Sequence, residues 1–185
     1  MTRMFVTAIA LCAMAIPSAF AQTHTPYAGL EVRPIKALSA EQVDDLRSGR
    51  GMGLALAAEL NGYPGPMHVL ELGKELALTA DQRARVQSLF ESMRAEAVPI
   101  GERLVAQEAA LDRAFASRTV TSDSLALLTA SIGETQAALR NAHLKYHLST
   151  AALLEPGQVA RYAELRGYGL DGQGHRHDQP HRRQH

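Results

Sequence analysis

Three short phrases of the same form divide this chain, and each lies where a helix is expected to begin. They are Leu38–Gln42, Leu78–Gln82 and Leu154–Gln158. In the second phrase, Thr79 is a favourable N-cap and Gln82 falls at position N3, so the two side chains can form a capping box. In the third phrase, Pro156 suits the first helical position and Gln158 again falls at N3. These repeated helix starts predict a helical protein.

Two long stretches of helical periodicity follow the Thr79 cap. Residues 80–117 and 124–153 carry apolar or small side chains at steps of three and four residues. The connection between them is short, so we expect antiparallel neighbours, with a kink in the first helix at Pro99. Shorter helices are expected at 39–47, 54–60, 67–77 and 157–166. The fold class is therefore all-α: a long antiparallel helical hairpin with short flanking helices.

The second long helix has a continuous apolar seam, which bears on the oligomeric state. This seam runs from Leu125 to Leu153, with Leu139 near its middle. It is longer than the short helices are expected to cover. We therefore expect a second copy of the chain to pack there, giving a homodimer in which Leu139 lies at the interface.

The start of the chain has the form of a secretory signal peptide. An apolar stretch covers residues 4–16, and Ala19–Ala21 is a small-x-small cleavage site. Cleavage would leave a mature chain that begins at Gln22 and enters the periplasm. Cys12, the single cysteine, would leave with the signal. Reading Cys12 as a lipoprotein cysteine is the alternative, although Leu11 before it is larger than that pattern favours.

The remaining chain divides by composition into three parts. Residues 22–63 form an extended leader with short helices, and residues 64–167 form the main helical domain. Residues 168–185 form a tail rich in Gly, His and Arg, which we expect to be disordered. No segment after the signal is long and apolar enough to predict a transmembrane helix.

The phrases at Leu78–Gln82 and Leu154–Gln158 resemble the LTxxQ signature of the Spy/CpxP family of periplasmic proteins. Relatives in this family include zinc-resistance-associated proteins and periplasmic heavy-metal sensors. The resemblance covers roughly residues 64–167. It implies a curved, intertwined helical dimer. For the metal-sensing relatives it also implies His and Met ligands on the second long helix, a His pair before the first phrase and a carboxylate just after it.

Histidine spacing provides the main chemical signal in this chain. His143 and His147 are four residues apart on the second long helix, so both imidazoles share one face and are close enough to share a metal ion. They lie about one turn earlier than the family pattern. Before the first phrase there is one histidine, His68, with Glu71 three residues later. The carboxylate that the resemblance implies has Glu91 as its nearest candidate. The alternative is that His143 and His147 are polar residues flanking the seam.

The tail adds a second histidine-rich segment. Its histidines are His175, His177, His181 and His185. Such a composition is typical of loose chelation of divalent metals, or simply of a solvated, mildly basic tail. Imidazole accepts Zn, Ni, Co and Cu, so a divalent transition metal is the expected cofactor.

Other function classes are not supported. Acidic and basic residues cancel to a formal net charge of zero, which argues against nucleic-acid binding. Residues 49–55 superficially match a dinucleotide-binding glycine loop, but no strand is predicted before them, so we interpret the glycines as a tight corner between helices. No motif of a metalloprotease, di-iron bundle or serine hydrolase is present. We therefore expect no enzyme activity.

Two functions remain open at this point, and the enrichment in histidine favours the first of them. One is metal binding, in heavy-metal sensing or resistance. The other is an ATP-independent periplasmic chaperone that holds unfolded proteins in the envelope stress response. A membrane-bound signalling protein is a further expected partner.

Overall fold

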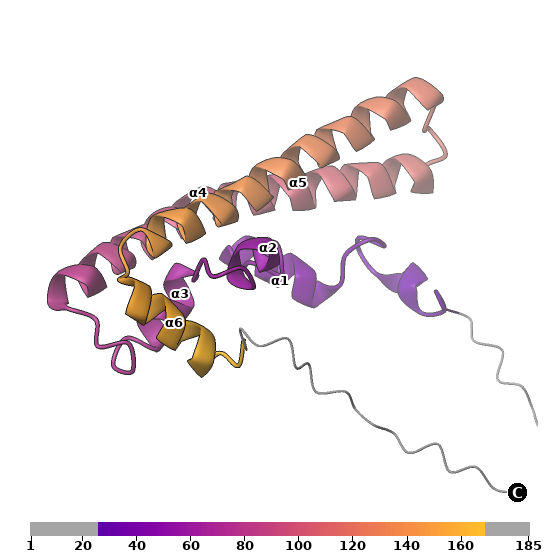
Figure 1. The fold of residues 1–185 in the computed structure, drawn as a ribbon. Helices are drawn as coiled ribbons and strands as arrows, with labels where there is room; N and C mark the ends of the chain where they lie inside the picture. Colours follow the sequence, from indigo (N-terminus) through magenta and orange to yellow (C-terminus); the bar gives the residue numbers. More distant parts are fainter. Residues whose placement is uncertain (1–25, 169–185) are drawn as a thin grey trace, which may run out of the picture.

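The computed structural model describes residues 26–168 and confirms the all-α fold class (Figure 1). Within these residues there are six α-helices and one short 3-10 helix, and no strand. They are η1 (Leu30–Val32), α1 (Ala40–Ser48), α2 (Leu56–Glu59), α3 (Pro66–Glu71), α4 (Ala80–Ala116), α5 (Ser122–Ala151) and α6 (Pro156–Leu165). The signal peptide expected at 1–21, with Cys12, and the tail from residue 169 lie outside the described residues.

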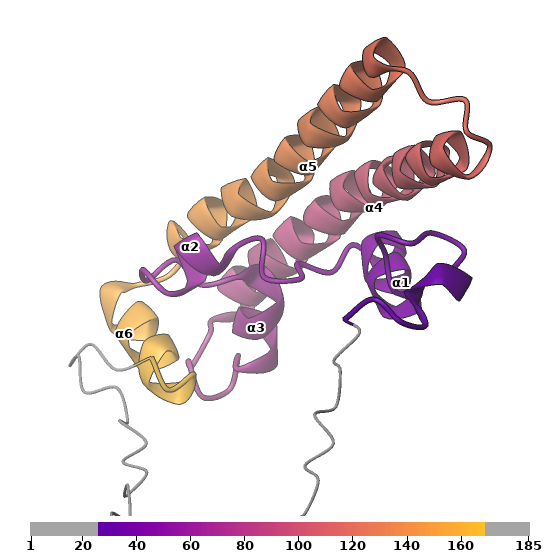
Figure 2. The same cartoon turned by 90° about the vertical axis from the view of Figure 1, so that its right-hand side faces the viewer.

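Helices α4 and α5 form the predicted antiparallel hairpin (Figures 1 and 2). Their bounds agree with the expected ranges to within about two residues. At the start of α5, the Thr121 side chain accepts from the backbone N–H of Ser124, which fixes the turn between the helices. Pro99 lies inside α4, and the helix continues through it. The tip of the hairpin extends beyond α1, α2, α3 and α6 in both views.

The short helices cover the other part of the hairpin and create two apolar cores. Near the middle, Leu46 of α1 packs with Ala97 and Leu104 of α4 and Leu139 of α5. At the base, the buried residues come from α3, α4 and α6 and the turns beside them: Val69, Leu76, Val86, Leu154 and Tyr162. The leader from Ile35 onward is therefore part of the same packed unit as the hairpin.

Two of the short helices differ from their expected ranges. Helix α2 begins at Leu56 rather than 54, because the N-cap residue Ala55 has φ −99° and ψ 10°, which lie outside the α-helical region. Helix α3 ends at Glu71 rather than near 77. Residues after it fold back in turns that bury Leu76, and Ala77 takes a positive φ of 49°. Tertiary packing of Leu76 outweighs local helix propensity here.

The two clearest phrases meet in space through their glutamines. Gln82 Nε2 donates to Gln158 Oε1 (2.8 Å), and Gln158 Nε2 donates back to Gln82 Oε1 (3.1 Å). Each amide also donates to a backbone carbonyl of the opposite segment: Gln82 to Leu153 (2.9 Å) and Gln158 to Leu76 (3.1 Å). Each glutamine also accepts from the backbone N–H of the residue that caps its own helix, Thr79 for Gln82 and Glu155 for Gln158. One hydrogen-bond network therefore joins the two helix starts and the base of the hairpin.

The expectation for Leu139 needs correction. Its side chain is 3% exposed and packs inside the core of a single chain, so it does not mark a dimer interface. The reason is that side chains of α4, together with Leu46 of α1 and Ile35 of the leader, form one buried cluster with Leu139. Exposed apolar side chains occur instead at the hairpin tip, at Phe115 and Leu127. The homodimer stays a prediction.

Candidate functional site

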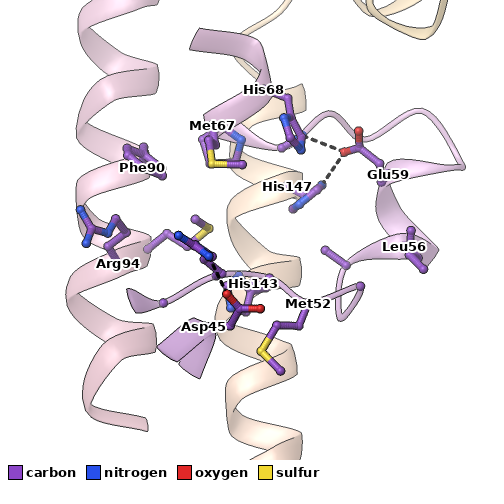
Figure 3. Close-up of a pocket in the computed structure, with 18 of the residues that line it drawn as sticks. Asp45, Met52, Leu56, Glu59, Met67, His68, Phe90, Arg94, His143 and His147 are labelled. Atoms are coloured by element: carbon purple, nitrogen blue, oxygen red, sulfur yellow. Dashed lines mark hydrogen bonds and ion pairs between the residues drawn. The ribbon is translucent and has the colours of Figure 1, made fainter. Parts of the chain in front are cut away.

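A cavity of about 690 Å³ lies where the short helices meet the hairpin (Figure 3). Its walls come from five helices, α1 to α5, from the loop between α1 and α2, and from the residues that follow α6. Between residues 26 and 168 the sequence contains three histidines and three methionines, and all six line this cavity. They are Met52, Met67, His68, Met93, His143 and His147. Every imidazole and thioether in the described chain therefore lines this one cavity.

His143 is the most deeply buried of these side chains. It is 2% exposed, and its Nε2 atom is buried without a hydrogen-bond partner. The backbone of Gly51 lies against the ring, since a Cβ there would be 3.7 Å from Nδ1. Burial, and to a smaller extent repulsion from His147, lower the pKa of His143. The imidazole is therefore neutral at pH 7, the form that ligates metals.

His147 is held in one orientation and one tautomer. Its Nδ1 lies 2.7 Å from the carbonyl oxygen of Tyr63, and because a carbonyl only accepts, Nδ1 must carry the proton. The lone pair of the neutral ring is then on Nε2. The ring packs so closely on Gly65 that a Cβ there would lie 2.9 Å from Nε2. A glycine is therefore required for this placement.

His68 and the two acidic candidates lie in different surroundings. His68 Nδ1 is 2.8 Å from Glu71 Oε2, so Glu71 orients the ring from outside and is not part of the cavity wall. Glu91 is exposed on α4, accepts from Gln87 (2.8 Å), and also does not line the cavity. The structure thus brings His68 together with His143 and His147 at the cavity, but neither of the two carboxylates. The tail candidates His175, His177 and His181 lie outside the described residues.

Glu59, which sequence reasoning missed, is the buried acid of the site. Its Oε1 accepts from the hydroxyls of Tyr162 and Tyr168 (3.1 Å for the latter), and its Oε2 accepts from the Gly65 N–H (3.2 Å). Arg166 lies 3.7 Å from Oε1. Burial and the bond to Glu59 raise the pKa of Tyr162, which keeps that hydroxyl protonated as a donor. The signal in the sequence that could have identified Glu59 was an acidic residue at the end of the otherwise apolar stretch of α2.

Charges around the cavity balance. Three acids (Glu41, Asp45 and Glu59) and three arginines (Arg50, Arg94 and Arg166) line it. Asp45 pairs with Arg50 at 2.7 Å. Within residues 26–168, no three His, Cys, Asp or Glu side chains are close enough to hold one metal ion together. Imidazoles alone therefore do not complete a conventional divalent site in one chain.

The glycine-rich corner at 49–55 has a structural role at this cavity. Gly49 ends α1 with a left-handed backbone (φ +69°), and Gly51 gives the space that the His143 ring occupies. The corner places Met52 at the cavity. It connects two helices, as the sequence indicated, and no strand precedes it among the described residues.

Comparisons with known protein families, with curated proteins and with solved structures give no match for this chain. Among residues 26–168, none of the helices combines the length and apolarity needed to cross a bilayer.

Proposed function

We propose that this chain is an exported metal-binding protein of the Spy/CpxP type, acting in heavy-metal sensing or resistance. The observation that carries the proposal is the convergence of His68, His143 and His147 on one cavity, with the Nε2 atom of His143 buried and unpartnered. A buried polar nitrogen without a partner is costly, and a bound cation would satisfy it. The signal-like start of the chain supports export.

The surroundings of two further imidazoles favour the same function. His147 donates Nδ1–H to a carbonyl, and His68 has its Nδ1 against a carboxylate. Metal-ligating histidines commonly have this support, which fixes the tautomer and raises the basicity of the other nitrogen. His143 needs no such partner to be neutral, because burial already lowers its pKa. A metal held here would connect α5 to the short helices.

A second candidate function rests on exposed apolar surface beside the same cavity. Five large apolar side chains that are 40% exposed or more fall between residues 52 and 67: Met52, Leu56, Leu60, Tyr63 and Met67. Clusters of this kind mark binding sites for apolar partners. They favour the alternative, an ATP-independent chaperone that holds unfolded proteins.

Metal-dependent stabilisation tests the first proposal. The protein used carries Ala at His175, His177, His181 and His185, so that the tail does not bind metal. Zn²⁺, Ni²⁺, Co²⁺ or Cu²⁺ should raise its melting temperature, with a stabilisation of about 2.7 kcal/mol at a free metal concentration 100 times the dissociation constant. Replacing His143 and His147 with Ala should abolish the rise. Asn141→Ala, an exposed change on the same helix, should leave it intact.

The outcome that contradicts metal binding also identifies the alternative. If no metal shifts the melting temperature, yet the protein suppresses aggregation of an unfolded client at stoichiometric ratio, the chaperone function is correct. In that case Leu56→Ser and Leu60→Ser should reduce the suppression, because they remove apolar surface beside the cavity.

A further inference from the structure

The cavity beside the short helices is far larger than a metal ion. Its volume of about 690 Å³ corresponds to roughly twenty water molecules, at about 30 Å³ each in the liquid. Pockets that bind small organic molecules commonly have volumes of about 300–1,000 Å³. Met52, Leu56 and Met67 line the cavity and are each at least 40% exposed, so its mouth opens to solvent beside them. An organic molecule can therefore enter this cavity and fill a large part of it.

Apolar side chains line opposite sides of the cavity. Figure 3 shows Phe90 of α4 and Met67 of α3 on one side and Leu56 of α2 on the other. Met93, which is buried, also contributes to the wall from α4. The polarisable sulfur of methionine makes favourable contacts with aromatic rings, and a phenylalanine ring packs well against another ring. A molecule built of aromatic rings therefore suits this wall.

Several polar side chains of the wall already have partners within the protein. Ser48 donates to the carbonyl of Asp44 (2.6 Å), and Tyr168 donates to Glu59 (3.1 Å). The Nδ1–H of His147 donates to a backbone carbonyl (2.7 Å). An apolar ligand displaces water from the cavity without breaking these hydrogen bonds, whereas a strongly polar ligand would have to compete for them. The wall therefore favours an apolar ligand.

The charged side chains of the wall favour an uncharged ligand. Three acids are offset by three arginines. Asp45 pairs with Arg50 at 2.7 Å, and Glu59 has Arg166 at 3.7 Å in addition to its hydrogen bonds. The remaining acid and arginine are both exposed to water: Glu41 and Arg94. Because neither sign of charge is in excess, the wall does not compensate a charged ligand for the hydration that it would lose on entry.

From these observations we infer that the cavity binds an uncharged aromatic molecule, held mainly by apolar contacts with Leu56, Met67 and Phe90. Burial lowers the pKa of His143, so the imidazole that lines this cavity adds no positive charge at pH 7 and is compatible with such a ligand. The inference goes beyond the proposed metal-binding function. It does not depend on that function, which rests on the histidines of the cavity.

A matched pair of fluorescent probes tests the charge of the ligand. N-phenylnaphthylamine is uncharged, anilinonaphthalene sulfonate carries a sulfonate on the same ring system, and both become brighter in apolar surroundings. In the presence of EDTA, which removes metal ions, the uncharged probe should bind saturably, with one molecule per chain, and more tightly than the sulfonate. Naphthol should displace it more effectively than octanol, an aliphatic alcohol of similar hydrophobicity.

Two leucines of similar exposure test where the probe binds. Leu56 is 54% exposed and lines the cavity, whereas Leu60 is 57% exposed and does not line it. Leu56→Ser should weaken binding of the uncharged probe by about 3–10-fold, since the probe covers the exposed half of this leucine. Leu60→Ser should leave binding unchanged. In methyl-labelled protein, the NMR signals of Met67 and Met93 should shift and saturate with the probe, and this readout holds even if a variant folds poorly.

The outcomes separate this inference from the proposed function. Saturable binding that depends on Leu56 and not on Leu60 supports the inference. Equal weakening by the two substitutions would place the probe on the exposed apolar surface and overturn it, as would unmoved signals of Met67 and Met93. Binding of the sulfonate at least as tight as that of the uncharged probe, or equal displacement by octanol, would overturn the assigned class of ligand. The metal-dependent rise in melting temperature tests the proposed function separately.

Discussion

A close contact between helix backbones occurs where α1 crosses α4 at Gly101, and it allows a direct test of the fold. A Cβ built on Gly101 would overlap the carbonyl oxygen of Leu46 and lie 2.8 Å from its carbonyl carbon. Carbon atoms in favourable contact are about 3.5–4.0 Å apart. Gly101→Ala therefore forces α1 to move away from α4 by roughly 1 Å.

Two opposing effects set the magnitude of this change. Overpacking of a tight core contact costs about 1–3 kcal/mol, and occasionally more. Here the overlap is with backbone, which has no rotamer to change, so we take the upper part of that range. Alanine recovers about 1 kcal/mol through its higher helix propensity. The free energy of unfolding should thus fall by about 1–2 kcal/mol, which lowers the melting temperature by about 2–8 °C for a chain of this size.

Gly133 on α5 provides the matched control. It is also a helical glycine, but it is exposed and a Cβ there meets no atom within 4 Å. Gly133→Ala should therefore gain the propensity term alone and raise the free energy of unfolding by roughly 0.5–1 kcal/mol. Glycine-to-alanine substitution is therefore expected to lower the free energy of unfolding at position 101 and to raise it at position 133.

Urea unfolding followed by circular dichroism measures both variants, and hydrogen exchange adds a local readout. In Gly101→Ala, the amides of α1 should exchange faster than in the wild type, because α1 has been displaced. The cavity should respond as well, since Glu41, Asp45 and Ser48 of α1 form part of its wall. If Gly101→Ala stabilises the protein as much as Gly133→Ala does, α1 does not cross α4 as described.

Two further predictions concern the glutamine pair and pH. Gln82→Ala and Gln158→Ala should each lower the free energy of unfolding by about 1–3 kcal/mol, and the double variant should show a coupling of at least about 0.5 kcal/mol. The control Gln87→Ala changes an exposed glutamine and should cost under about 0.5 kcal/mol. Additive effects of Gln82→Ala and Gln158→Ala in urea unfolding would disprove the pairing. The pKa of His143 lies below its ordinary value of 6.5 because of burial, so only the unfolded chain takes up a proton as pH falls below about 6.5. The free energy of unfolding should therefore decrease from there down to the folded-state pKa, and His143→Gln should flatten this part of the pH profile; an unchanged profile would contradict the assignment.

Local signals in the sequence determined the helix starts and the fold class. Ser39, Thr79 and Thr121 all cap helices through the N3 residue, in the way that their side chains allow. The long periodic stretches predicted the bounds of α4 and α5 to within two residues, because three- and four-residue spacing is visible without knowing the packing partner. Helix α3 was overestimated, because the turns that bury Leu76 depend on α4 and α6 being in place.

The sequence identified only part of the candidate site. The spacing of His143 and His147 put both rings on one helix face, which is a local property of α5. Nothing local indicated that Met52, Met67 and Met93, which come from three elements, would line the same cavity. Glu59 was likewise hidden, since its hydrogen-bond partners Tyr162 and Tyr168 are more than 100 residues away.

The sequence by itself thus determined the helices, their caps and the antiparallel hairpin, because propensity, capping and periodicity act over a few residues. Only the tertiary structure decided that Leu139 is buried in one cluster with side chains of α1 and α4, that Gln82 and Gln158 pair, and that imidazoles and thioethers line one cavity. These features depend on how the leader folds back over the hairpin. That path depends on close contacts at Gly65, which packs against the His147 ring, and at Gly101, which packs against the backbone of Leu46. A side chain is excluded at each glycine by a residue that is distant in the sequence.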